Sequence, residues 1–254
     1  MSQADLLRQV CENPSDDRAR LAYAAALEKA GDPRGEFIRL QVASAAGQPF
    51  TAREGHLLAA HRDEWLEPIR HMLTPHGRNA KGFRFIRGFP AFVQMSPSGF
   101  LQYGRELFMQ VPVQHADIYF GDKEDVRRCL DRHELAQLIS VSFEADGIDD
   151  DLCVRLAGCA RLANARWLVL AQNKIGQRGA EALAASAVMD NKVVINLSYN
   201  PCDPVEKPAV DFDGSVQGLD QSAFGQELVA RYGRKPWLTF PWRSRRARPS
   251  RFEV

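Results

Sequence analysis

The side chains of this sequence that could do chemistry are few, and their spacing does not fit catalysis or metal binding. His56 and His61 are five residues apart, which puts them on poorly matched faces of a helix. His71 and His76 lie on either side of a predicted loop. The acidic residues 144–151 lack the alternating ligands and closing glutamate of a calcium loop, and they are better explained as a helix start. With no hydrolase, kinase or phosphate-binding motif present, we expect no enzyme activity, metal, cofactor or small-molecule substrate.

Five arginines gather near the end of the sequence, among several aromatic residues. This combination suits contact with the phosphate groups of nucleic acid or of anionic lipid. The formal net charge of +1 gives no further reason to expect a polyanionic partner. The alternative is a solvated tail whose tryptophans pack against the rest of the protein. The arginines are Arg243, Arg245, Arg246, Arg248 and Arg251.

A recurring apolar pattern organises the middle of the chain. The template Leu162, Leu168, Leu170, Asn173 and Ile175 recurs 27 residues earlier and, in part, 27 residues later, and weaker units precede it at a step of 25. Because alternate apolar residues bury one face of a strand, and a helix behind the strand can close the core, each unit is predicted to be strand, turn and helix. The other strands are expected at Ala91-x-Val93, Ala116-x-Ile118, Val141-x-Phe143 and Ile195-x-Leu197.

The best-defined unit, residues 168–184, resembles the ribonuclease-inhibitor-like class of leucine-rich repeats. This resemblance implies an α/β fold: a short leucine-rich-repeat solenoid of about five units over residues 89–202, with a parallel sheet on the concave face and helices on the convex face. Asn173 and Asn200 fall where the chain turns out of its strand, and an Asn amide there can satisfy unpaired backbone groups. Asp146 and Gly121 are imperfect substitutes at the matching positions.

Strand residues between the buried positions must point away from the core, and they form the predicted partner-binding face. Exposed aromatic residues are enriched at binding hot spots, so Phe, Tyr and Trp on this face favour a protein partner. The alternative is that flanking loops or the C-terminal segment cover these rings. The predicted partner-binding residues are Phe92, Gln94, Asp117, Tyr119, Ser142, Glu144, Trp167, Val169 and Asn196.

Residues 1–88 are predicted to form an all-helical capping module. Asn13-Pro14 and Asp32-Pro33 each place a capping residue before a proline suited to a first helical turn, and Gly31 is typical of a helix end. The stretch over residues 4–45 closely resembles the bacterial repeat-companion domain, which implies a repeat-bearing bacterial protein. We expect Leu21, Ala24, Ala25 and Leu27 to form a core face, and Arg34, Glu36 and Arg39 to form local ion pairs. The helices are expected at residues 4–11, 16–30, 34–45 and 52–66.

Residues 203–254 are predicted to form a C-terminal cap, with a helix over residues 221–232, followed by the arginine-rich tail. The five scattered cysteines, without a C-x-x-C pair, predict free thiols. No apolar run is long enough to cross a membrane, and we expect a cytoplasmic protein. The sequence therefore favours an intracellular module that binds another protein. Two alternatives stay open: a toxin-neutralising immunity or inhibitor protein, and a nucleic-acid or anionic-surface binder that uses the tail.

Overall fold

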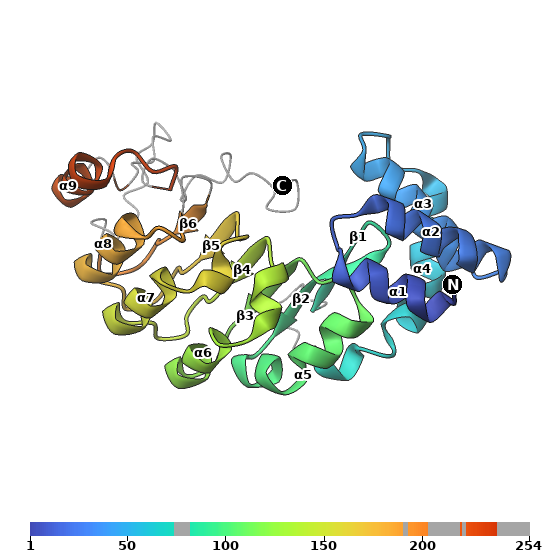
Figure 1. Cartoon of the computed structure of the whole chain (residues 1–254), viewed down its shortest axis with the longest axis horizontal. Coiled ribbons are helices and arrows are strands. Elements are labelled where there is room, and N and C mark those ends of the chain that lie inside the picture. Colours follow the sequence, from blue (N-terminus) through green and yellow to red (C-terminus); the bar gives the residue numbers. More distant parts are fainter. Residues whose placement is uncertain (74–81, 190–192, 203–218, 220–221, 238–254) are drawn as a thin grey trace. The chain divides into compact units, whose positions relative to one another are not determined.

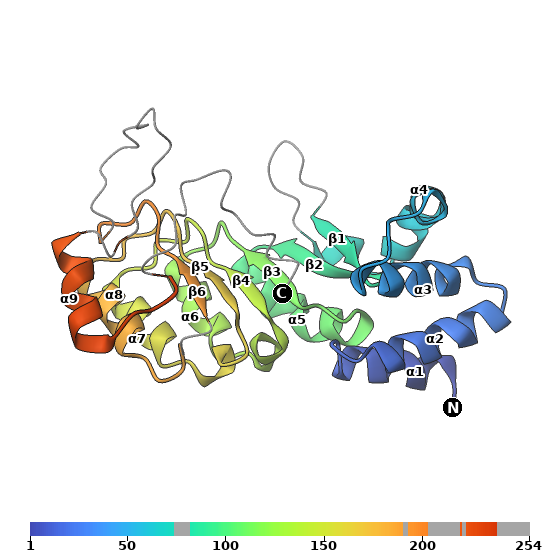
Figure 2. The same cartoon turned by 90° about the horizontal axis from the view of Figure 1, so that it is seen from above.

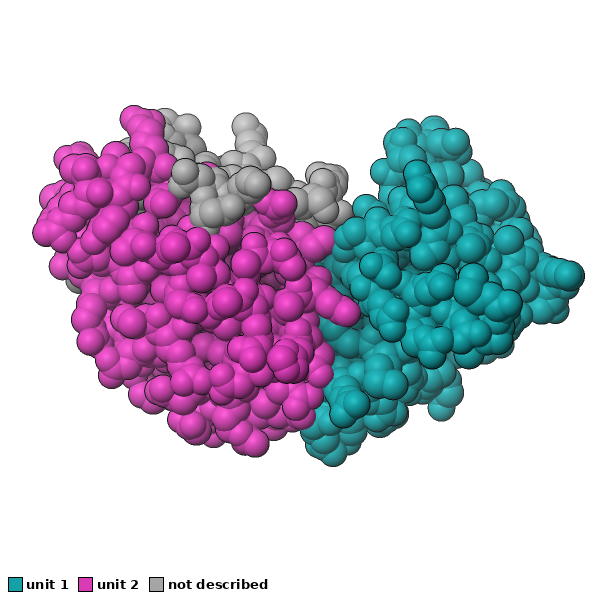
Figure 3. Space-filling view, viewed as in Figure 1, with its two compact units in different colours: residues 1–95, 102–116 teal, residues 96–101, 117–254 magenta. Residues whose placement is uncertain are grey.

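The protein is an α/β chain that divides into two compact units. Unit 1 comprises residues 1–95 and 102–116, and unit 2 comprises residues 96–101 and 117–254 (Figure 3). The structure, a computed structural model, describes residues 1–73, 82–189, 193–202, 219 and 222–237.

The strands pair in the order in which they occur along the chain (Figure 1). The first two strands are antiparallel, whereas the fourth pairs with the fifth, and the fifth with the sixth, in parallel. Parallel neighbours in chain order require a crossover between each pair of strands, and helices supply it here. The strands are β1 (Phe83–Ile86), β2 (Phe89–Met95), β3 (His115–Ile118), β4 (Ser140–Ser142), β5 (Trp167–Val169) and β6 (Val194–Asn196).

Unit 1 begins with four helices, as the sequence predicts. Side chains of Ser2, Asp16, Asp32 and Thr51 cap their first turns. The helix predicted over residues 16–30 is present, but the predicted cap at Asn13-Pro14 is wrong, because Asp16 supplies the cap two residues beyond the proline. α2 and α3 form a helical hairpin (Figure 2). The helices are α1 (Gln3–Glu12), α2 (Asp17–Lys29), α3 (Pro33–Ala45) and α4 (Ala52–Leu66), followed by the 3-10 turn η1 (Arg70–Met72).

The core face of α2 differs by one residue from the predicted face. Leu21 and Ala25 are exposed, whereas Arg20 and Tyr23 join Ala24 and Leu27 in the interior. This rotation is possible because the fully buried Arg20 guanidinium lies 5.2 Å from the ring centre of Phe89. It also donates a 2.6 Å hydrogen bond to the carbonyl of Pro14. A hydrogen-bonded arginine over an aromatic ring can thus occupy a core position that the hydrophobic pattern assigns to leucine.

The predicted ion pairs of the α3 region are partly confirmed. Arg39 lies 3.1 Å from Glu28, and Glu36 lies 2.6 Å from Arg53. Arg34 instead stacks over Phe89, with 5.0 Å between its guanidinium carbon and the ring centre.

Residues 1–88 are not all helical, since they include β1. β1 and β2 form a hairpin with a two-residue turn, in which Arg87 has φ 51° and Gly88 has φ 86°. Two positive φ values are what a tight hairpin turn with native twist requires. A Cβ on Gly88 would lie 2.4 Å from Ile38 Cγ1, and the Gly88 amide donates to Gln41 Oε1 at 2.7 Å. Glycine therefore allows the turn to dock closely on α3.

Unit 2 alternates strands and helices at the places where the sequence pattern predicts them. The helix predicted over residues 221–232 is present, and it begins two residues later than predicted. α7 and α8 pack side by side on the same side of the strands β4 to β6 (Figure 1). The helices are α6 (Lys123–Cys129), α7 (Asp150–Ala157), α8 (Gln177–Ala185) and α9 (Ala223–Tyr232). A further helix, α5 (Pro97–Gln110), has residues in both units. The 3-10 turns η2 (His133–Gln137) and η3 (Ala160–Leu162) precede β4 and β5.

Buried asparagine side chains join successive strand ends in unit 2, as predicted. Asn173 Nδ2 donates to the carbonyls of Phe143, Leu170 and Ala171, and its Oδ1 accepts from the amides of Asp146 and Ile148. Asn200 repeats this arrangement one unit later, donating to the carbonyls of Leu170, Leu197 and Ser198 and accepting from the amide of Ile175. We call these positions the amide ladder. Each amide satisfies backbone groups that the turn leaves unpaired.

Asp146 occupies the ladder position before Asn173. Its Oδ1 accepts from the amide of Gly121, just as Asn173 Oδ1 accepts from the amide of Asp146. Its Oδ2 therefore lies where Asn173 has its donor nitrogen, and this buried oxygen has no hydrogen-bond partner among the described residues. Burial raises the pKa of the Asp146 carboxyl to about 7. A protonated carboxyl can donate from Oδ2, as the asparagines do, whereas a carboxylate cannot.

Candidate binding surface on unit 2

The aromatic residues predicted to face a partner are buried. The exposed fractions are 9% for Phe92, 7% for Tyr119 and 6% for Trp167, so the expectation that these rings are exposed is wrong. Each ring is covered by other parts of the chain and takes part in further interactions. Strand alternation places a side chain on a face of the sheet, but it does not reveal which distant segments cover that face.

Four residues of the predicted face remain accessible in unit 2. Asp117 in β3, Glu144 just after β4, Val169 in β5 and Asn196 in β6 are all half-buried. We call these four residues the strand row. Pairing of Val169 with Asn196 keeps the last two in register. Of the other predicted residues, Ser142 is buried and Gln94, which belongs to unit 1, is half-buried.

Hydrogen bonds fix the orientation of two side chains of the strand row. Glu144 Oε1 accepts from Gln172 Nε2 at 2.7 Å. Asn196 Oδ1 accepts from the amide and the hydroxyl of Ser198, at 2.9 Å and 2.6 Å. These bonds restrict the side chains before any partner arrives, which reduces the entropy lost on binding.

A second row, which was not predicted from the sequence, lies at the turns. Phe120, Ala145, Gln172 and Tyr199 each precede a ladder position or its Gly121 counterpart, and each has a left-handed backbone with φ between 59° and 61°. We call these residues the turn row. The rings at its two ends are exposed, 59% for Phe120 and 55% for Tyr199. The signal was present in the sequence, because these residues share the 25- and 27-residue spacing of the pattern.

The arginine-rich tail, with Arg243, Arg245, Arg246, Arg248 and Arg251, lies outside the described residues. The predicted helix before it is present as α9. Glu181 of α8 holds this helix, accepting from Arg231 Nη1 at 2.6 Å and from the Tyr232 hydroxyl at 2.9 Å.

Nucleophilic and metal-binding groups are not gathered at either row. None of the five cysteines forms a disulfide, as predicted, and all five are buried. Burial raises the pKa of the Cys11 and Cys129 thiols to about 12. In the described ranges, no three His, Cys, Asp or Glu side chains are grouped so that they could hold a metal ion. No helix within the described part of the chain is both long and apolar enough to cross a membrane.

Sequence reasoning also missed a pocket in unit 1, between α4 and β1. Its residues come from separate segments, and no single motif marks them. Among them, Glu54 is a buried carboxylate at the start of α4.

The fold and these surfaces define an α/β protein with a mostly parallel sheet and with accessible side chains, three of them polar, in or just after the strands β3 to β6. Compared with models of known protein families and with curated proteins, the chain matches none.

Proposed function

We propose that unit 2 is a leucine-rich-repeat solenoid that binds another protein through the strand row. The observation that supports this most is that β3, β5 and β6 carry accessible side chains at the same repeat position, Asp117, Val169 and Asn196. Glu144 adds an accessible carboxylate two residues beyond Ser142, the buried residue at that position in β4, and buried amides hold the turns at Asn173 and Asn200. A rigid framework that presents a series of side chains at regular intervals is the usual binding device of repeat proteins. The resemblance of residues 168–184 to ribonuclease-inhibitor-like repeats agrees with this proposal.

The charge of the strand row favours a partner with basic side chains. Asp117 and Glu144 are carboxylates, and Glu144 is hydrogen-bonded to the neutral amide of Gln172 and makes no ion pair with any described residue. A lysine or arginine from the partner would supply the missing charge at a half-buried site, where an ion pair is screened less than on an open surface.

The size of the row sets a limit on its contribution. Neighbouring strands are about 4.8 Å apart, so four strands span only about 14 Å. A stable interface buries about 800 Å² on each partner. The strand row is therefore expected to act together with the turn row, whose exposed Phe120 and Tyr199 can supply apolar contact area.

Charge reversal of the strand row tests the proposal. Purified chain is used to capture partners from a lysate of the native organism, and bound proteins are quantified by mass spectrometry. Glu144→Arg should lower the amount of the specific partner at least about tenfold, because like charges placed opposite each other cost several kcal/mol. The matched control is Asp151→Arg, which reverses an exposed carboxylate on α7. Equal capture by wild type and Glu144→Arg would contradict the proposal.

Trp167 and Tyr119 are unsuitable for this test. Both rings are buried, so their substitution would disturb the fold as well as any binding surface.

The two alternative functions have less support than protein binding through the strand row. A toxin-neutralising role comes from the family resemblance alone, and fold analogy does not define a target. Nucleic-acid binding rests on arginines outside the described residues. Neither gains support from the described side chains.

A further inference from the structure

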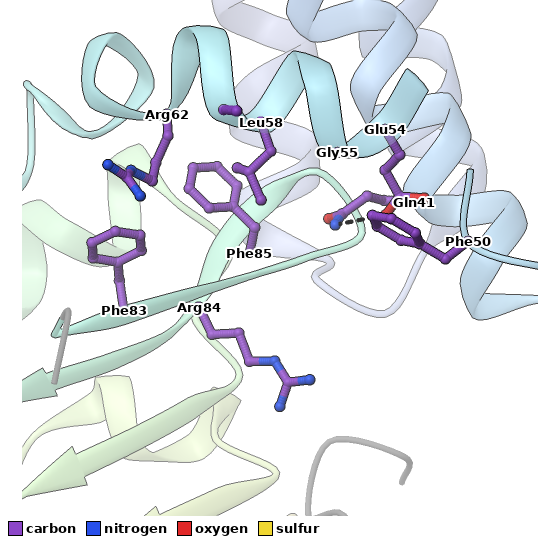
Figure 4. Close-up of a pocket in the computed structure, with 10 residues that line it drawn as sticks. Gln41, Phe50, Glu54, Gly55, Leu58, Arg62, Phe83, Arg84 and Phe85 are labelled. Atoms are coloured by element: carbon purple, nitrogen blue, oxygen red, sulfur yellow. Dashed lines mark hydrogen bonds between the residues drawn. The ribbon is translucent and has the colours of Figure 1, made fainter. Parts of the chain in front are cut away.

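The pocket of unit 1 has the size of a small-molecule site. Its volume is about 540 Å³, within the range of about 300 to 1,000 Å³ usual for ligand pockets. α4 forms one wall and β1 the other, and Gln41 of α3 and Phe50 close one end (Figure 4). All of these residues belong to unit 1.

Glu54, at the end of the pocket near Phe50, is a buried carboxylate without a counter-ion. It is 3% exposed, and no described cation forms an ion pair with it. Its Oε1 accepts from Gln41 Nε2 at 3.1 Å and its Oε2 accepts from the Ser44 hydroxyl at 3.0 Å. These are neutral donors, and the first-turn amides of α4 offset only part of the charge. A buried carboxylate is ordinarily paired, because leaving its charge uncompensated is costly.

The carboxylate is held in place and still has acceptor capacity. Gln41 Oε1 accepts from the Gly88 amide at 2.7 Å, which orients the Gln41 amide nitrogen toward Glu54. A carboxylate offers about four acceptor sites, and two are used here. The remaining sites are available for donors from a ligand in the pocket that Glu54 lines.

Aromatic rings line the pocket on both sides of this carboxylate. Phe85 and Phe83 project from β1 toward α4, and Phe50 lies beside Glu54 (Figure 4). Phe50 is 67% exposed, so a ligand in the pocket would cover an apolar ring that now faces solvent. A carboxylate next to aromatic faces is the combination that recognises organic cations, since the ring face and the carboxylate both attract positive charge.

The arginines of the pocket do not supply the missing charge. Arg62 lies beside Phe83, at the end away from Glu54, and pairs with Asp63 at 3.3 Å. Arg84 is exposed and lies on the opposite side of β1 from Phe83 and Phe85 (Figure 4). The end of the pocket that contains Glu54 therefore keeps its negative charge.

We propose that this pocket binds an organic cation, with an alkylammonium group at Glu54 and an apolar body between the phenylalanine rings. The ammonium takes the open acceptor sites of Glu54, and the rings of Phe50 and Phe85 enclose the adjoining carbon atoms. The cation can belong to a free amine or to a lysine side chain, since both present the same group.

The experiment titrates the full chain with matched probes and follows them by ligand-observed NMR. The probes are 4-phenylbutylamine, the neutral 4-phenylbutan-1-ol, and the peptide acetyl-Gly-Lys-Gly-amide. Wild type should bind the amine at least about tenfold more tightly than the alcohol, as expected for a desolvated cation–π contact with an added ion pair. Binding of the peptide in place of the free amine would identify lysine as the source of the cation.

Two variants test the residues. Glu54→Gln should reduce the preference for amine over alcohol to less than about twofold, and Phe50→Ala should weaken amine binding about fivefold. Because Phe50 is exposed, its replacement leaves the core intact and keeps the proposal testable if Glu54→Gln fails to fold. The matched control is Phe120→Ala, which removes an exposed ring of unit 2 and should change nothing. Equal binding of amine and alcohol, no binding of any probe at millimolar concentration, or full amine binding by Phe50→Ala would overturn the proposal.

Discussion

Replacing Asp146 with asparagine should stabilise unit 2 at neutral and alkaline pH. In wild type, the ionised carboxylate leaves Oδ2 buried without a donor, at the place where Asn173 and Asn200 each donate to backbone carbonyls. Asp146→Asn restores the donor with almost no change in volume. A buried polar group without its partner costs about 1 to 3 kcal/mol, and the variant should recover a gain of this size at pH 8.

The pKa of Asp146 gives the pH dependence and its sign. Burial raises the pKa to about 7 from an ordinary value of 3.8, and the negative charge of Glu144 acts in the same direction. The folded protein therefore holds this proton more tightly than the unfolded chain does. The stability from the protonated carboxyl is complete below pH 4 and is lost as the pH rises to about 7. At about 1.4 kcal/mol for each tenfold change in proton affinity, the loss is at most about 4 kcal/mol, of which about 2 kcal/mol falls between pH 5 and pH 7.

The assay is amide hydrogen exchange of the full chain at pH 5 and pH 8, corrected for the intrinsic rates. Peptides from β4 and β5 report on unit 2 separately from unit 1. The gain in protection from Asp146→Asn should be larger at pH 8 than at pH 5. The reverse substitution, Asn173→Asp, is the matched control, and it should introduce a similar pH dependence. If the effect of Asp146→Asn is the same at both pH values, the assignment of a protonated carboxyl to the ladder is incorrect.

Three further substitutions test other contacts by thermal or urea denaturation. Gly88→Ala should destabilise unit 1 by more than about 2 kcal/mol, because it combines a positive φ with a steric clash. Its control is Gly147→Ala, where φ is positive but the surrounding space is open, and this substitution should cost only about 1 kcal/mol. Equal effects of the two substitutions would show that the clash at residue 88 is relieved. Arg20→Ala should cost about 3 kcal/mol through lost packing and a lost buried cation, whereas Arg18→Ala on the exposed side of α2 should change stability by less than about 0.5 kcal/mol; similar values for both would mean that Arg20 is not a core residue. Asn200→Ala should cost about 2 to 4 kcal/mol, since it removes four hydrogen bonds and leaves the Ile175 amide and the Leu197 carbonyl without another donor or acceptor among the described residues. A change below about 1 kcal/mol would mean that water replaces these bonds.

Local patterns in the sequence were sufficient to predict most elements. The 25- and 27-residue spacing located the strands of unit 2, and the asparagines at positions 173 and 200 were correctly placed at the turns. The capping residue Asp32 located the start of a helix correctly, because a cap depends on residues within one turn. Such features involve neighbours in the chain, and the sequence displays these neighbours directly.

Features that depend on distant segments could not be predicted in the same way. Trp167 and Tyr119 have the alternation of outward-facing strand residues, but their burial is decided by parts of the chain far from their own strand. Arg20 has the composition of a surface residue, and only the position of Phe89, 69 residues later, explains its burial. The pocket at Glu54 depends on three segments that meet only in the folded protein.

The amide ladder also has a consequence for the order in which unit 2 folds. Asn173 and Asn200 each donate to a carbonyl 30 residues earlier, so the hydrogen bonds of each asparagine require only the preceding strand to be in place. Closing loops of this modest length costs little chain entropy, so folding can proceed sequentially from one strand to the next. At Asp146, the equivalent hydrogen bond from Oδ2 can form only when the carboxyl is protonated. Above pH 7, we expect unfolding of unit 2 to begin at the contact between Asp146 and Gly121, and the strands β4 to β6 to unfold later.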